Sequence, residues 1–251
     1  MVLLTALAIA ASLMLVAWLM YRATDKASWV DAFWSGNLAV LAVWYAVSQD
    51  GDPARRILVA VVGGLWGARL AVHIAVRVAR GAEDPRYLTL RAEWKTNLPL
   101  RFLRFFMVQG VVDVVLSVPF LLMARDASPF GRVTELAGLA LWAVALAGES
   151  VADAQLARFK RDPANRGAVC RTGLWGRSRH PNYFFEWLLW VAFALMATGT
   201  PWGWLSWSAP VLMLYFLLRV TGIPLTEKQA IASKGDAYRA YQREVSAFLP
   251  W

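Results

Sequence analysis

The sequence has little of what the common soluble hydrolases use to build their active sites. Its single cysteine, Cys170, excludes an intrachain disulfide and a cysteine-built metal site. Its two histidines, His73 and His180, lie far apart in the sequence, and neither an H-E-x-x-H nor a G-x-S-x-G motif occurs. The sequence therefore predicts no metal centre, and it argues against metallohydrolase and serine acyl-transfer chemistry.

Charge is also absent from long stretches of the chain. Residues 2–21 and 202–218 carry no ionisable acid or base, and five further apolar stretches carry one to three such groups each: 29–48, 57–78, 105–124, 136–156 and 181–198. About 20 apolar residues in a helix cross the hydrocarbon layer, whereas barrel strands show ~10-residue alternation. We therefore predict an all-α integral membrane protein. It is a bundle of seven transmembrane helices forming one domain over residues 1–251, with a short cytoplasmic C-terminal helix after Gly222.

The distribution of basic residues predicts the orientation of these helices. Arg22 and Lys26 follow the first stretch, which favours an N-terminus outside the membrane. Seven spans from that start place 21 of the 26 Lys and Arg on the cytoplasmic side. Such a basic face suits anionic lipid, so the net charge of +9 requires no nucleic acid. We expect a multi-pass protein of the cell membrane with its C-terminus in the cytoplasm.

Several ionisable residues fall within the predicted spans, where charge is costly unless it faces protein or water. Arg69, His73 and Arg77 recur at i, i+4 and i+8 and share one helix face, which indicates a pocket unless Arg77 reaches the headgroups. Glu149 and Asp153 form an i, i+4 pair. These acids can pair with the arginines, or they can accept hydrogen bonds from a ribose or an adenine amine.

Two aspartates begin or interrupt other spans. Asp31 lies between Trp29 and Trp34 at the start of the second span, where it is either an interfacial anchor or a site residue. Asp113 lies in the middle of the fourth span. For Asp113 we expect a structural partner rather than a catalytic role.

A cationic cluster precedes the sixth span. Arg171, Arg177, Arg179 and His180 come directly before Pro181, a residue suited to the first turn of a helix. The free N–H groups and positive dipole end of that helix would point at the cluster. The pattern predicts an anion site, suited to a phosphate-bearing cofactor at the membrane face.

Several motifs resemble the bacterial branch of the steroid 5-alpha-reductase family. They are R-H-P-N-Y at 179–183 with the following Glu186, G-I-P-L-x-E at 222–227, Y-x-x-Y-x-R-x-x-S-A-F-L-P-W at 238–251, V-D-x-x-W around Asp31 and E-D-x-R-Y at 83–87. An R-H-P-x-Y motif also occurs in isoprenylcysteine carboxyl methyltransferases and phospholipid methyltransferases. Those membrane enzymes use S-adenosylmethionine.

The resemblance implies a membrane reductase that holds NADPH in the cytoplasmic half of its bundle, here in a bacterial inner membrane. By motif, Asn182 and Glu186 touch the nicotinamide end, and Asp153, Arg158 and Lys160 lie near the adenosine and its phosphates. The full set of expected cofactor-binding residues is Arg77, Glu149, Asp153, Arg158, Lys160, Arg171, Arg179, His180, Asn182, Tyr183, Glu186, Glu227 and Tyr241.

The implied reaction reduces a C=C bond conjugated to a carbonyl in a lipophilic, steroid- or isoprenoid-like enone. Animal steroid reductases bind the enone oxygen with a Gln-Glu pair on the second span and a Tyr on the third. This sequence carries Asp31 on the second span and Arg69 and His73 on the third, so we expect these three and Glu186 to be catalytic. Alternatives are a methyltransferase using S-adenosylmethionine and a non-catalytic lipid-binding or transport protein. The many arginines favour the phosphates of NADPH over a sulfonium cofactor.

Overall fold

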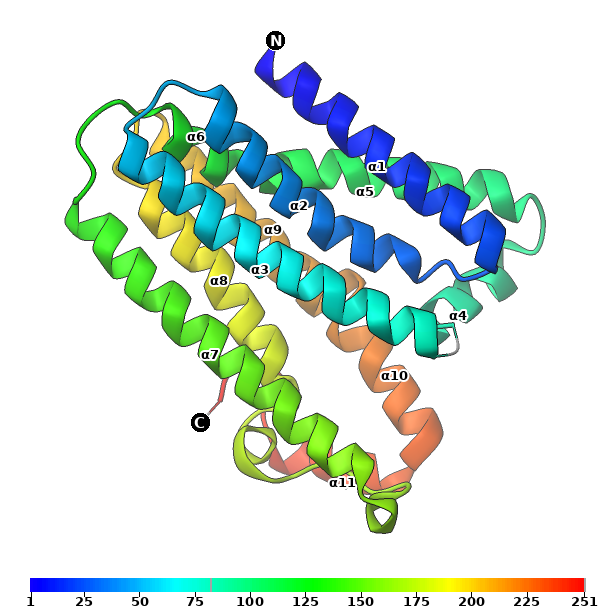
Figure 1. Ribbon diagram of the computed structural model, residues 1–251. Helices are drawn as coiled ribbons and strands as arrows, with labels where there is room; N and C mark the ends of the chain where they lie inside the picture. The colour runs from blue at the N-terminus through cyan, green and yellow to red at the C-terminus, as the bar shows by residue number, and fades with distance from the viewer. Residues whose placement is uncertain (82, 251) are drawn as a thin grey trace. The chain divides into compact units, whose positions relative to one another are not determined.

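The computed structural model of the chain describes residues 1–81 and 83–250, and those residues contain helices but no strand (Figure 1). Trp251, the last residue of the C-terminal motif, lies outside them. The helices longer than one turn are α1 Val2–Thr24, α2 Trp29–Ser48, α3 Pro53–Arg80, α4 Pro85–Trp94, α5 Leu98–Leu116, α6 Val118–Arg125, α7 Val133–Arg161, α8 Pro181–Ala197, α9 Ser208–Tyr215, α10 Ile223–Lys234 and α11 Asp236–Glu244. Shorter turns are η1 Pro163–Asn165, η2 Gly173–Gly176, η3 Gly203–Trp207 and the π-helical η4 Phe216–Val220. The predicted all-α fold is confirmed for this part of the chain.

The contacts between residues group into two compact units. Unit 1 comprises Met1–Arg132 with Ala197–Ser206, and unit 2 comprises Val133–Met196 with Trp207–Trp251. Unit 1 thus holds α1 to α6, and unit 2 holds α7 to α11.

Six helical segments of the described chain are long and apolar enough to cross a membrane: Val2–Thr24, Trp29–Ser48, Pro53–Arg80, Leu98–Arg125, Val133–Arg161 and Gly203–Lys234. They indicate a multi-pass membrane protein, and large apolar side chains such as Leu4, Val47 and Leu65 are exposed on them, where lipid can cover them. The expected span at 181–198 is helical as α8, but its 17 residues are too short for it to be counted with the six.

The chain between the third and fourth spans is more ordered than the sequence predicts. We expected a loop over 79–104, but that segment contains α4 and the first turns of α5. The Asp84 side chain accepts a hydrogen bond from the Arg86 N–H (2.9 Å), and Pro85 occupies the first turn, so a capping pair starts α4. The tail after Gly222 likewise forms two helices, α10 and α11, rather than one.

A buried arginine joins α3 to the loop after α6. The Arg55 side chain is fully buried, and its guanidinium donates to the carbonyls of Asp126 (2.7 Å) and Ser128 (2.9 Å). The Asp126 carboxylate lies 3.5 Å from Arg55 and 2.6 Å from Arg132. Burial opposes ionisation of Asp126, but hydrogen bonds from Ser128 and Arg132 outweigh it and lower the pKa of this carboxyl. The carbonyl groups and the nearby carboxylate compensate the cost of burying the Arg55 guanidinium.

Glycines allow α2 and α3 to pack closely in unit 1. A Cβ atom at Gly67 would lie 2.7 Å from the carbonyl oxygen of Ser35 and 2.9 Å from the Cβ of Ala39. A Cβ atom at Gly64 would meet only a methyl of Val43, at 3.3 Å. Close approach of two helices at such small residues is typical of membrane proteins.

Replacing Gly67 with alanine is expected to destabilise the protein, because the two helices must move apart. The cost of overpacking is about 1–3 kcal/mol, which exceeds the gain of up to ~1 kcal/mol in helix propensity. Gly64→Ala is the matched control, and it should change the thermal unfolding temperature little. Equal unfolding temperatures for the two variants in detergent would show that Gly67 does not set the α2–α3 distance.

Candidate functional site

Arg179, from the cationic cluster before α8, forms hydrogen bonds with other residues of unit 2. The Nε of Arg179 donates to Glu227 (2.6 Å), and its Nη1 donates to the carbonyls of Gln242 (3.0 Å) and Val245 (2.5 Å). The Arg179 backbone N–H donates to the Ser246 carbonyl (2.8 Å). Arg179 therefore holds the chain after α11 against the start of α8.

Glu227 receives several further donors. His180 Nε2 lies 3.2 Å from its Oε1, Gln242 Nε2 donates to its Oε2 at 2.7 Å, and the Tyr238 hydroxyl donates to its Oε1 at 3.5 Å. Burial is the main cause that raises the pKa of Tyr238, and the Glu227 charge adds to it. A carboxylate of the chain itself therefore occupies the position where the sequence predicts a phosphate beside Arg179 and His180.

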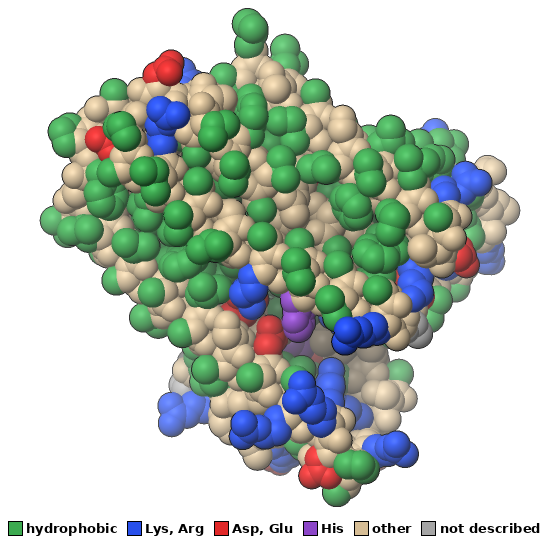
Figure 2. All heavy atoms as spheres, in the orientation of Figure 1, with side chains coloured by type: hydrophobic (Ala, Val, Ile, Leu, Met, Phe, Trp, Pro, Cys, Tyr) green, Lys and Arg blue, Asp and Glu red, His purple; other side chains and the backbone are tan. Residues whose placement is uncertain are grey.

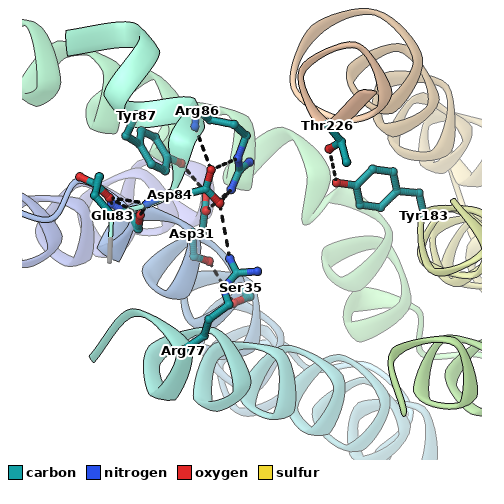
Figure 3. A network of polar contacts seen from close by, with 10 residues as sticks. Asp31, Ser35, Arg77, Glu83, Asp84, Arg86, Tyr87, Tyr183 and Thr226 are labelled. Atoms are coloured by element: carbon teal, nitrogen blue, oxygen red, sulfur yellow. Dashed lines mark hydrogen bonds and ion pairs between the residues drawn. The ribbon is translucent and has the colours of Figure 1, made fainter. Parts of the chain in front are cut away.

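Three other expected residues of this region also contact neighbouring parts of the chain. Arg171 pairs with Glu244 (2.6 Å) in an exposed ion pair, and its guanidinium lies 5.3 Å from the centre of the Tyr241 ring. The buried Tyr241 hydroxyl donates to the carbonyl of Trp175, and burial raises its pKa. Tyr183 bonds Thr226 through the two hydroxyls (3.1 Å), as Figure 3 shows.

Polar side chains also meet between α7 and α8. The Asn182 amide donates to Asp153 across the two helices (3.4 Å), and Glu186 accepts a hydrogen bond from the Trp190 indole (3.1 Å). Both Glu149 and Glu186 are buried. Gly148 makes the approach possible, since a Cβ there would lie 2.3 Å from the Phe185 ring. The structure thus brings Asp153 and Asn182 together, as expected for one site.

A groove of about 580 Å³ opens at the basic C-terminal end of α7. Its lining comes from the last turns of α7 and the chain up to η2: Val151, Ala154, Gln155, Arg158, Phe159, Asp162, Asn165, Thr172 and Gly173. The Gln155 side chain accepts from the Leu174 N–H (3.0 Å), and Gly173 adopts a positive φ of 61° against it, so the wall is fixed at this point. Volumes of this size are typical of small-molecule and cofactor sites.

Arg158 is the cation of this groove. Its side chain is exposed, and it has no ion-pair or hydrogen-bond partner among residues 1–81 and 83–250. Asp162 shares the lining, but its carboxylate accepts from the Ala164 N–H (2.9 Å) as the cap of η1. Figure 2 shows Lys and Arg gathered on unit 2 around the end of α7 and α11. The expected Lys160 is exposed on the same helix but does not line the groove.

In unit 1, Asp31 lies in a polar cluster with α4 (Figure 3). Its Oδ1 accepts from the Tyr87 hydroxyl (2.6 Å) and its Oδ2 from Arg86 (2.6 Å). Arg86 also forms a two-point pair with Asp84 (3.0 and 3.1 Å). Burial and the neighbouring Asp31 charge raise the pKa of Tyr87, and the Asp31 charge raises that of Arg86.

The same cluster fixes the start of α2. Glu83 accepts from the N–H groups of Ala27 (2.5 Å) and Ser28 (3.0 Å) and from the Ser28 hydroxyl. Acidic groups at a helix N-terminus are favourable because of the free N–H groups there. The E-D-x-R-Y motif therefore joins α2 to α4 and holds Asp31 in a fixed orientation.

The remaining expected residues lie along α3. Arg69, His73 and Arg77 share one face of this continuous helix, as their spacing predicts. Arg77 reaches Asp84 (3.9 Å), which connects it to the Asp31 cluster, whereas His73 is exposed. In the described part of the chain, no hydrogen bond or ion pair joins His73 to Asp31.

Comparison with known proteins assigns the chain to a family. Residues 17–245 match the family described as "Protein of unknown function (DUF1295)". The chain belongs to this family. The chain is also similar to the "Uncharacterized protein C594.04c" of Schizosaccharomyces pombe, with 27% identity over 259 residues, which cover 90% of this chain and 73% of that protein. No solved structure matches the chain.

Sequence reasoning missed residues that complete both sites of this DUF1295 protein. Tyr87 and Arg86 bind Asp31. Both belong to the E-D-x-R-Y motif, which marked them in the sequence but did not reveal that they contact Asp31. Gln155, Asn165 and Thr172 line the groove with Arg158. Their separation along the chain gave no periodic pattern from which a common site could be read.

Proposed function

We propose that this protein is a membrane-embedded reductase that uses NADPH to reduce a C=C bond conjugated to a carbonyl in a lipophilic substrate. The observation that carries the proposal is the groove at the end of α7, which has a volume of about 580 Å³ and contains Arg158, an arginine without a partner in the described part of the chain. The motif resemblance to steroid 5-alpha-reductases supports the same reaction. We place the protein in a bacterial inner membrane as a seven-span bundle, with its N-terminus outside and the basic end of α7 on the cytoplasmic side.

The residues of the groove suit the phosphate-bearing half of a dinucleotide. Arg158 offers a planar donor that matches a phosphate, and no carboxylate of the described chain pairs with it. Asn165 and Thr172 add polar groups to the same lining, and the Phe159 ring adds an apolar surface for a base. The buried acids Glu149 and Glu186 and the Asp153–Asn182 pair would hold the polar groups of the remaining half.

The proposed chemistry needs a hydride, a proton and a hydrogen-bond donor. NADPH, when bound, would supply the hydride to the β-carbon. The α-carbon takes a proton that comes from solvent, which completes the reduction. While the hydride adds, negative charge develops on the carbonyl oxygen, and a hydrogen-bond donor in a water-poor site stabilises it. We assign this role to Tyr87, whose hydroxyl turns from Asp31 to the carbonyl oxygen while Arg86 keeps Asp31 in place. We keep the prediction that Arg69 and His73 on α3 contact the substrate.

NADPH oxidation by the purified protein with enone lipids or sterols tests the reaction. Arg158→Ala is expected to raise the KM for NADPH about 10- to 100-fold, because it removes charge-assisted hydrogen bonds worth ~1.5–3 kcal/mol. Arg161→Ala is the matched control. Arg161 is also exposed in the last turn of α7 and has no partner among the residues that the structure describes, but it does not line the groove. A KM that responds equally to both changes would remove the groove from the proposal.

The alternative is a methyltransferase that uses S-adenosylmethionine, which one observation favours. The Glu227 carboxylate pairs with Arg179 and lies within hydrogen-bond distance of His180 at the start of α8, so that region already holds an anion of the chain itself. Carboxylates such as Asp153 and Glu186 would suit a sulfonium cation. Methyl transfer from labelled S-adenosylmethionine to membrane lipid, with no NADPH oxidation, would select this alternative.

A further inference from the structure

A polar pair lies fully buried between α2 and α5, outside the sites described above. The Asn37 amide donates to Oδ2 of Asp113 at 2.6 Å, and both residues have no exposed surface. Both helices belong to unit 1 and to candidate membrane spans. A carboxylate with one hydrogen bond in such a place would carry a large desolvation cost.

One oxygen of each side chain has no hydrogen-bond partner in the described part of the chain. These atoms are Oδ1 of Asn37 and Oδ1 of Asp113. Both are acceptors when Asp113 is ionised, so neither can satisfy the other. When Asp113 carries a proton, its O–H becomes a donor, and an acid and an amide can then form two hydrogen bonds in a ring.

The charges of the surrounding helices do not compensate a carboxylate at this position. Asp113 makes no ion pair with a described residue. The other charged residues of α1, α2, α5 and α6 lie towards the helix ends: Arg22, Asp31, Arg101, Arg104 and Arg125. The helix α3 also packs against α2, and its basic residues form no ion pair or hydrogen bond with Asp113 in the described part of the chain: Arg55, Arg56, Arg69, His73, Arg77 and Arg80. Asp31 is six residues before Asn37 on α2, about 9 Å along the axis, and it is itself an acid.

We infer that Asp113 binds a proton as a neutral carboxylic acid and closes a two-bond ring with Asn37, its O–H donating to Oδ1 of Asn37. The pair is then uncharged, and every polar atom in it has a partner. The two hydrogen bonds of the pair fix the position of α2 along α5 within the candidate membrane spans. The inference is independent of the proposed reductase activity, because it concerns neither the groove nor the Asp31 cluster.

Infrared spectroscopy in heavy water tests this assignment directly. The full chain, purified at neutral pH in a detergent without carbonyl groups, should show the C=O band of a protonated carboxyl group, and labelling of aspartate with ¹³C should shift it. The band should be lost in Asp113→Asn, which keeps both hydrogen bonds as an amide pair and should keep the unfolding temperature. In Asn37→Ala the band should remain but move to higher frequency, because the acid loses its acceptor.

An unlabelled band or its persistence in Asp113→Asn would overturn the assignment, as would the absence of any protonated carboxyl band in the wild type. The labelling experiment uses the unaltered chain, so the test stands even where a variant does not fold. Since NADPH turnover is not part of the readout, failure here leaves the reductase proposal standing, and failure of the reductase proposal leaves this one standing.

Discussion

Replacing Tyr87 with phenylalanine is expected to lower kcat for NADPH-dependent reduction by about 10²–10³-fold. The change removes the hydroxyl that we assign to the carbonyl oxygen, and loss of one such donor from a preorganised site costs this much in other enzymes. The ring packing around Tyr87 stays, as does the pair between Asp31 and Arg86. The KM for NADPH should stay unchanged, because the cofactor is assigned to unit 2.

Tyr45→Phe is the control for this prediction. Tyr45 is also a buried tyrosine of unit 1, and its hydroxyl bonds Ser117 (3.1 Å) instead of a carboxylate. Its loss should leave kcat within a few-fold of the wild type. If Tyr87→Phe reduced kcat no more than Tyr45→Phe, the Asp31–Tyr87 pair would be structural.

Replacing Glu227 with alanine is expected to destabilise the protein by about 3–5 kcal/mol. The change leaves Arg179 and His180 without their carboxylate, and removing one partner of a largely buried ion pair has an effect of this size. Arg179 would keep its bonds to the Gln242 and Val245 carbonyls, but its charge would be uncompensated. Thermal unfolding in detergent, followed by circular dichroism, measures the loss.

Two further variants make this result interpretable. Glu244→Ala breaks the exposed pair with Arg171 and should cost only ~0–1 kcal/mol. Adding Arg179→Met to Glu227→Ala should recover part of the loss, because the uncompensated cation is then gone. Equal stability of Glu227→Ala and Glu244→Ala would contradict the role of Glu227 as the centre of the tail contacts.

Much of the helical fold could be predicted because the apolar runs exceed the length that crosses a bilayer. The runs at 2–21, 29–48 and 136–156 lie within α1, α2 and α7. The helix α4 could not be predicted in the same way, since its ten residues carry no apolar period and depend on contacts with α2. The helix α11 carries its own signal, because the buried Tyr238 and Tyr241 lie three residues apart on one face of an otherwise polar helix.

The candidate site was harder to predict, because spacing along one helix does not reveal partners on another. The stripe of Arg69, His73 and Arg77 follows from helix geometry alone. The pairing of Arg179 with Glu227, 48 residues apart, does not, so residues that resemble an anion site proved to bind a carboxylate of the chain. Arg158 became the main cofactor candidate only when the groove around it was known.

The central claim, that the groove at the end of α7 binds NADPH, is tested most directly by ligand-induced stabilisation. A ligand that binds the native state at 100 times its Kd stabilises it by about 2.7 kcal/mol. We predict that NADPH raises the unfolding temperature of the wild type and of Arg161→Ala clearly more than that of Arg158→Ala at the same concentration. Stabilisation by S-adenosylmethionine without an effect of NADPH, or an undiminished effect of NADPH on Arg158→Ala, would contradict the claim.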